Sequence, residues 1–153
     1  MYAGTKSFFG GHTMTTRGNL LLWPNLSGWG AAAMLYAAVA NASGYDECWT
    51  NNTVVLGAAT AATHTHSSSG PCYLDMQPCD IDRTSSLPSL HLADNTLFVP
   101  SDNVAAIHCG KGHAVTFADW QRAGHDVGSK LHVGVPTDDA IVQKAKALLG
   151  LDQ

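Results

Sequence analysis

The sequence predicts an all-β fold in which short parallel strands stack in successive coils, closed at the C-terminal end by short helices. The main observation is a repeated step from an asparagine into a short apolar run that ends at proline or glycine. The step occurs at residues 18–22, 51–56 and 94–99. Asparagine favours turns and left-handed backbone, and β-branched residues favour strands. Stacked parallel coils would place one asparagine from each coil at the same corner.

The composition is a second observation that agrees with close stacking. The chain has 153 residues, of which 45% are hydrophobic and only 13% are charged, against ~25% in typical soluble domains. This length supports one domain with its own core. The formal net charge of -4 and the scattered 8 Lys and Arg residues predict no nucleic-acid partner. The longest apolar run, residues 31–40, is about half as long as the ~20-residue membrane helix, so no membrane insertion is expected.

A change of periodicity after residue 114 is the third observation. Residues 116–124 predict a short helix with a threonine N-cap and a glycine stop. Residues 138–149 predict a second helix, because Thr137 can cap it, two aspartates follow in its first turn and Gly150 ends it. We expect its apolar stripe to lie across the open end of the last coil. The stripe comprises Ile141, Ala145, Leu148 and Leu149.

The expected organisation is therefore parallel coils over residues 1–115 and a helical cap over residues 116–153. Residues 57–89, rich in Ala, Thr, Ser and Gly, are interpreted as a loop excursion from the coils. Residues 31–40 suit either a buried strand or a helix, and the pattern leaves both open. Residues 104–107 predict one more short strand. His12, after two glycines, is interpreted as a polar residue of a loop or edge turn.

The cysteines and glycosylation motifs favour an oxidising compartment, extracellular or lumenal. Four cysteines allow two disulfides: a local bridge between Cys72 and Cys79, and by elimination a long-range one between Cys48 and Cys109. Three Asn-x-Ser/Thr motifs make Asn25, Asn41 and Asn51 candidate glycosylation sites. The first residues lack the basic flank and apolar core of a signal peptide. We therefore expect the chain to be part of a longer precursor.

Residues 117–129, with Trp120, Gln121, Gly124, Asp126 and Ser129, resemble the segment with which secreted right-handed parallel β-helix proteins often close after their last coils. The asparagine-to-strand steps look like the coil turns of those pectate-lyase-like proteins. Residues 136–149 are also similar to the end of large eukaryotic, often algal, members. The resemblance spans residues 8–150. It implies a right-handed parallel β-helix (solenoid) fragment, the C-terminal portion of such a protein.

Two functions follow from this interpretation. The resemblance implies carbohydrate binding or polysaccharide processing by a lyase or hydrolase, with a polysaccharide as partner. The family's clustered carboxylates and Arg or Lys base cannot be mapped onto Arg17, Arg83 or Arg122, which lie in unrelated contexts. The sequence therefore assigns no catalytic residue and leaves open whether the chain is an enzyme. The alternative is a non-catalytic scaffold subunit that binds another protein chain in a larger assembly.

Other chemistry-bearing residues are interpreted conservatively. The histidine pairs at 64 and 66 and at 108 and 113 lack an identifiable third ligand, so we expect no metal and no other cofactor. Cys109 is not expected to be activated by His108, because neighbouring strand residues point to opposite faces. Asp80 and Asp82 could form a carboxylate pair for glycoside chemistry, but a solvated loop is the simpler interpretation. Any exposed tryptophan could stack on sugar rings, and Trp49 and Trp120 are expected to pack in the core or in the cap. The four tryptophans are Trp23, Trp29, Trp49 and Trp120.

Overall fold

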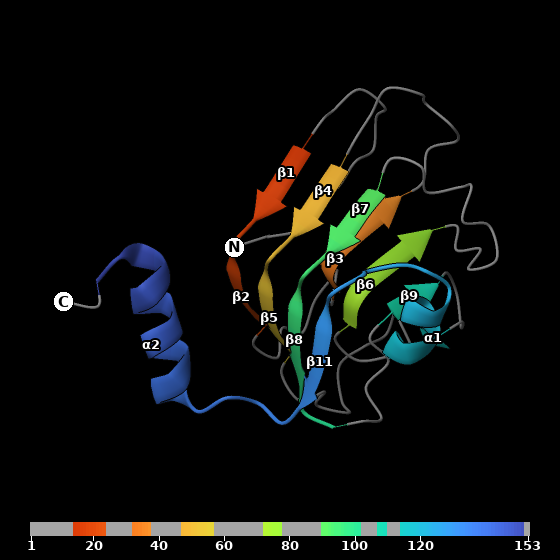
Figure 1. Cartoon of the computed structure of the whole chain (residues 1–153). Helices are drawn as coiled ribbons and strands as arrows, with labels where there is room; N and C mark the ends of the chain where they lie inside the picture. Colours follow the sequence, from red (N-terminus) through yellow and green to blue (C-terminus); the bar gives the residue numbers. More distant parts are fainter. Residues whose placement is uncertain are drawn as a thin grey trace.

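The structure, a computed structural model, describes residues 14–23, 32–37, 47–56, 72–77, 90–101, 107–109 and 114–151. Within these ranges the chain forms three β-sheets and two helices (Figure 1). Each sheet takes every third of the first nine strands, so strands that are neighbours in the sequence belong to different sheets. No helix in these ranges is long and apolar enough to cross a membrane.

Two of the sheets are wholly parallel and the third is mixed. The first has the order β1 (Met14–Arg17), β4 (Glu47–Thr50) and β7 (Leu90–Ala93). The second has the order β2 (Leu20–Trp23), β5 (Thr53–Leu56), β8 (Thr96–Val99) and β11 (Lys130–Val133). In the third, β3 (Ala32–Ala37), β6 (Cys72–Gln77) and β9 (Ile107–Cys109) are parallel, and β10 (Ala114–Val115) pairs antiparallel with β9.

The predicted parallel stacking of residues 20–22, 54–56 and 97–99 is confirmed. Leu20 aligns with Thr53, Thr53 with Thr96, and Thr96 with Lys130, so four strands share one register. The register follows from the repeated sequence step, because each apolar run begins directly after a corner residue. A slip of one residue would turn every apolar side chain to the opposite face of the sheet.

The predicted fold class, an all-β right-handed parallel β-helix fragment with capping helices, is wrong as stated. The described residues form an α/β-like mixture, two wholly parallel sheets with a third mixed sheet and two helices, and no continuous solenoid is evident in them. The repeated asparagine step correctly predicts which strands pair. The longer segments that link one sheet to the next lie outside the described residues, and local pairing alone did not determine the fold class.

The core lies between the sheets and under the short helix α1 (Phe117–Arg122). Its largest fully buried side chains are those of Trp49, Trp120 and Tyr73. Strand β5 is buried on both faces, whereas β8 alternates between half-buried and buried residues. Burial on both faces is typical of strands in parallel sheets that are covered on each side. The expectation that Trp49 and Trp120 pack in the core is confirmed.

Both predicted helices form with the predicted caps. The Thr116 hydroxyl accepts a hydrogen bond from the Asp119 amide at the start of α1. Thr137 does the same for the Ala140 amide at the start of α2 (Asp138–Leu149), and Gly150 ends α2 in a left-handed conformation. Cap side chains satisfy amides that the first helical turn leaves without partners.

The position predicted for α2 is wrong. From β11 the chain runs back past β8 and β5, and α2 lies on the β2 side of the sheet rather than over β11 (Figure 1). No residue of α2 is buried, and Leu148 and Leu149 are 46% and 72% exposed. The apolar periodicity gave the helix and its stripe, but it carried no information on which surface the stripe would meet.

Two further expectations are resolved in the described ranges. The ambiguous run at 31–40 contains strand β3, which favours the strand alternative. The segment 57–89, interpreted as a loop excursion, contains strand β6 with the fully buried Tyr73. His12 and most of the predicted strand at 104–107 lie outside the described residues.

Candidate functional site: a buried polar ladder with one open end

Three equivalent corners join strands of the first sheet to strands of the second, and a fourth corner joins Val127, which forms an isolated parallel bridge with Ala93, to β11. At each corner one residue has a left-handed backbone: Gly18 (φ 68°), Asn51 (φ 53°), Asp94 (φ 56°) and Gly128 (φ 80°). Glycine, asparagine and aspartate tolerate this conformation best. The backbone at Gly128 also lies close to the Asp94 side chain, because a Cβ at residue 128 would overlap the Asp94 carboxylate. Residue type at the corner is therefore set by backbone geometry.

The residue after each corner belongs to a polar row that we call the ladder: Asn19, Asn52, Asn95 and Ser129. Its backbone repeats identically from strand to strand. The amide of Thr53 donates to the Asn19 carbonyl (2.7 Å), Thr96 to Asn52 (2.8 Å) and Lys130 to Asn95 (2.8 Å). The one-asparagine-per-corner pattern predicted from the sequence is thus confirmed, with serine at the fourth corner.

Side-chain amides connect the ladder along its length. The Oδ1 atom of Asn52 accepts from both the backbone N and the Nδ2 of Asn19, each at 3.0 Å. The Oδ1 atom of Asn95 likewise accepts from the backbone N (2.9 Å) and Nδ2 (3.2 Å) of Asn52. The Nδ2 groups of Asn52 and Asn95 also donate to the carbonyls of Thr16 and Trp49. Asn52 and Asn95 are both 1% exposed, so these bonds replace water completely.

The ladder is closed at its Ser129 end. The Asn95 amide donates to Ser129 Oγ (2.6 Å), and Ser129 Oγ donates to Asp126 Oδ1. The Ser129 amide donates to the Asp126 carbonyl (3.2 Å), so both hydrogen-bond donors of Ser129 are used within the chain. Gln121 of α1 then donates from Nε2 to the Ser129 carbonyl (2.8 Å) and more weakly to that of Asp126 (3.3 Å).

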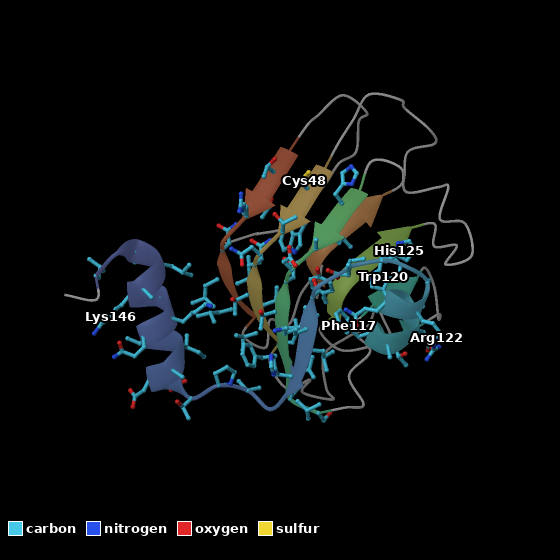
Figure 2. All side chains as sticks on the ribbon, in the orientation of Figure 1. Cys48, Phe117, Trp120, Arg122, His125 and Lys146 are labelled. Carbon is cyan, nitrogen blue, oxygen red and sulfur yellow. The ribbon has the colours of Figure 1, made fainter. Side chains whose placement is uncertain are left out.

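This closure gives a physical account of residues 117–129. Trp120 is 1% exposed and stacks on His125, with ring centroids 4.0 Å apart (Figure 2). Gly124 takes φ 92° to end α1, which brings Asp126 back to the ladder. The segment thus packs a helix on the core and terminates the polar row.

Burial perturbs the titration of this end of the ladder. Burial raises the pKa of the Asp126 carboxyl, and hydrogen bonds from Ser129, Tyr73 and Asn95 partly offset that rise. Burial, reinforced by the Asp126 charge, raises the pKa of Tyr73 well above 10.0. Asp126 Oδ2 is buried without a hydrogen-bond partner among the described residues. Burial lowers the pKa of His125, and Asp126 partly opposes that shift.

A small apolar groove separates α2 from the outer face of the second sheet. Its volume is about 170 Å³, below the ~300–1,000 Å³ of typical ligand sites. We interpret it as incomplete packing of α2 against the strands. Its lining comprises Leu20, Thr53, Val55, Thr96 and Phe98 from the sheet and Pro136, Ala140, Ile141 and Lys144 from the helix segment.

The structure describes only some of the site residues that the sequence predicts. Cys48 is half-buried and is a free thiol, so it does not form the predicted disulfide with Cys109 in this structure. The pairing of Cys72 with Cys79 stays a prediction, because residue 79 lies outside the described ranges. Asn51 is exposed at its corner, and its glycosylation stays a prediction. Asn25, Asn41, Asp80, Asp82, Arg83, His64, His66 and His113 also lie outside the described ranges. The described residues contain no cluster of three His, Cys, Asp or Glu side chains that could hold a metal.

Sequence reasoning missed Tyr73, and it did not assign Asp126 or Ser129 to the ladder. A signal for Ser129 was present. Residues 128–133 repeat the step of residues 18–22, with glycine at the corner and serine in place of asparagine before a short strand. No family model, curated protein or solved structure matches this chain.

Proposed function

We propose that the chain is a non-catalytic structural module of a larger assembly, in which its parallel sheets form a rigid platform for another protein chain. One observation carries the proposal: the buried polar groups hydrogen-bond to one another along the strand stack. Asn52, Asn95, Asp126 and Ser129 are 1%, 1%, 2% and 6% exposed, and each joins strands or closes the ladder.

Such a ladder favours rigidity over reactivity. Each internal hydrogen bond contributes about 0.5–1.5 kcal/mol, but a buried group left without a partner costs about 1–3 kcal/mol. Any sliding of one strand past another would leave several groups unpaired together. Because the ladder therefore fixes the register, it supports a role in which constant strand geometry is the useful property.

The test is an assay for the polysaccharide function that the family resemblance implies. The purified 153-residue chain would be incubated with polygalacturonate and with a neutral glucan, and new reducing ends and ultraviolet-absorbing unsaturated products would be measured. Affinity electrophoresis in gels containing the same polymers would detect binding without turnover. A scaffold gives no product and no retardation. Turnover or retardation that disappears on heat inactivation would overturn the scaffold proposal.

Carbohydrate binding is the second candidate, and one observation favours it. Phe98 of β8 and His132 of β11 stack with ring centroids 5.0 Å apart and 21° between their planes. Phe98 is half-buried and His132 is exposed, so the pair presents aromatic surface on the outer face of the second sheet. Flat aromatic surface is suited to packing on the apolar face of a sugar ring. If electrophoretic retardation were seen, Phe98→Ala should abolish it, whereas Leu148→Ala on α2 should not.

A further inference from the structure

The two ends of the ladder differ in chemistry. At the Ser129 end both donors of the serine are used by Asp126 of the same chain. At the other end Asn19 is exposed, and its backbone N and Nδ2 donate inward to Asn52. The Oδ1 atoms of Asn52 and Asn95 each accept two hydrogen bonds, whereas no described residue donates to the corresponding Oδ1 atom of Asn19. Within the described part of the chain, the ladder therefore ends in an acceptor that receives no hydrogen bond.

Among the described residues, nothing pairs with the backbone of β2 on the side away from β5. Strand β2 is the outermost strand of its sheet within the described ranges. Since the Asn19 carbonyl accepts from Thr53, alternation along a parallel pair directs Leu21 toward β5 and leaves the N–H and C=O groups of Leu20 and Leu22 on the free edge. Leu22 is 48% exposed. A row of open backbone groups is a template for another strand.

From these observations we infer that the free edge of β2 binds an extended strand of a partner protein, in parallel, with an asparagine directly before the strand. This inference rests on the proposed platform role and names the kind of partner. The partner's asparagine donates from its backbone N and Nδ2 to Asn19 Oδ1. Its strand then continues a pairing that the chain already makes between β2 and β5, β5 and β8, and β8 and β11.

A second copy of the chain fits this edge less well. Head-to-tail stacking would bring the Ser129 end of one copy onto Asn19 of the other, yet the Ser129 hydroxyl and amide already donate to Asp126. A two-fold pair of β2 edges would be antiparallel, which breaks the ladder geometry. We therefore place a strand of a different protein on this edge, rather than a second copy of the chain.

The probe is a labelled synthetic peptide with the sequence of residues 90–99, which carries the corner, asparagine and strand without a cysteine. Binding to the full chain would be measured by fluorescence anisotropy. We expect saturable binding, and about tenfold or greater weakening when the peptide carries Asn95→Asp, because that change replaces the Nδ2 donor with a second acceptor facing Asn19 Oδ1. The change lies in the peptide, so the fold of the protein is untouched.

Protein variants complete the test. Leu22→Pro removes an outward N–H and should abolish binding, whereas the matched variant Leu22→Ala retains that N–H and should bind as the wild type does. Equal binding of the unchanged peptide and the Asn95→Asp peptide, or no binding of either, would overturn the inference. The polysaccharide assays test the platform role independently of this experiment. Self-association in sedimentation velocity that is lost in Leu22→Pro would also overturn it, because the occupant would then be a second copy.

Discussion

Replacing Asn95 with alanine removes the most connected side chain of the ladder. Its Oδ1 accepts from the backbone N and Nδ2 of Asn52, and its Nδ2 donates to the Trp49 carbonyl and the Tyr73 hydroxyl. All of these groups are buried, so water does not replace the lost bonds. The Asn52 amide and the Trp49 carbonyl would be left without partners at about 1–3 kcal/mol each. Asn95→Ala should therefore lower the free energy of unfolding by about 2–6 kcal/mol.

The matched control is Asn19→Ala at the open end. Asn19 is exposed, and Asn52 Oδ1 keeps the backbone donor of residue 19 after the substitution. The expected loss is only about 0.5–1.5 kcal/mol. Urea unfolding followed by tryptophan fluorescence suits both variants, because Trp49 and Trp120 are buried in the native state. Equal losses at the two positions would refute the argument that burial makes the ladder stabilising.

Three further outcomes follow from the same geometry. Gly128→Ala should cost more than Gly18→Ala by about 1–3 kcal/mol in urea unfolding, because both have positive φ but only a Cβ at 128 meets the Asp94 carboxylate; equal costs would contradict the close packing. Burial raises the pKa of Asp126, so the native state binds a proton that the unfolded state releases above pH ~4, and stability from this group falls as pH rises through the folded pKa. Asp126→Asn should therefore gain stability relative to the wild type as pH rises from ~4 to 7, and a constant difference across that range would exclude the effect. Leu148→Ala should lower the melting temperature little, at a cost within about 0.5 kcal/mol, because Leu148 is 46% exposed; a cost of several kcal/mol would show that α2 packs more tightly than described.

Local chemistry made the strand pairing and both helices predictable from the sequence. Asparagine before an apolar run satisfies the left-handed corner and the ladder together, so one residue type reports both features. Thr137 and Gly150 likewise determine the ends of α2, because they satisfy groups that the helix itself leaves unpaired.

Tertiary placement was not predictable by the same reasoning. The apolar stripe of α2 did not indicate which surface the helix would pack against, and Leu148 and Leu149 are exposed in the structure. Strand β6 lies in a segment whose Ala, Thr, Ser and Gly content suggested a loop. Its pairing with β3 and β9, and the hydrogen bond from Asn95 to the Tyr73 hydroxyl, are long-range contacts that local composition does not report. The burial of Asp126 was not predictable, because a single acidic residue after a helix is usually exposed and the sequence around it does not indicate burial.

Amide hydrogen exchange measured residue by residue tests the ladder most directly. The backbone amides of Asn52 and Asn95 donate to side chains, at 2.9 Å to Asn95 Oδ1 and 2.6 Å to Ser129 Oγ. They should exchange as slowly as the amides between β5 and β8, whereas the outward amide of Leu22 should exchange fast. Rapid exchange at Asn52 and Asn95, in a chain whose β5 amides remain protected, would contradict the ladder as the element that holds these strands in register.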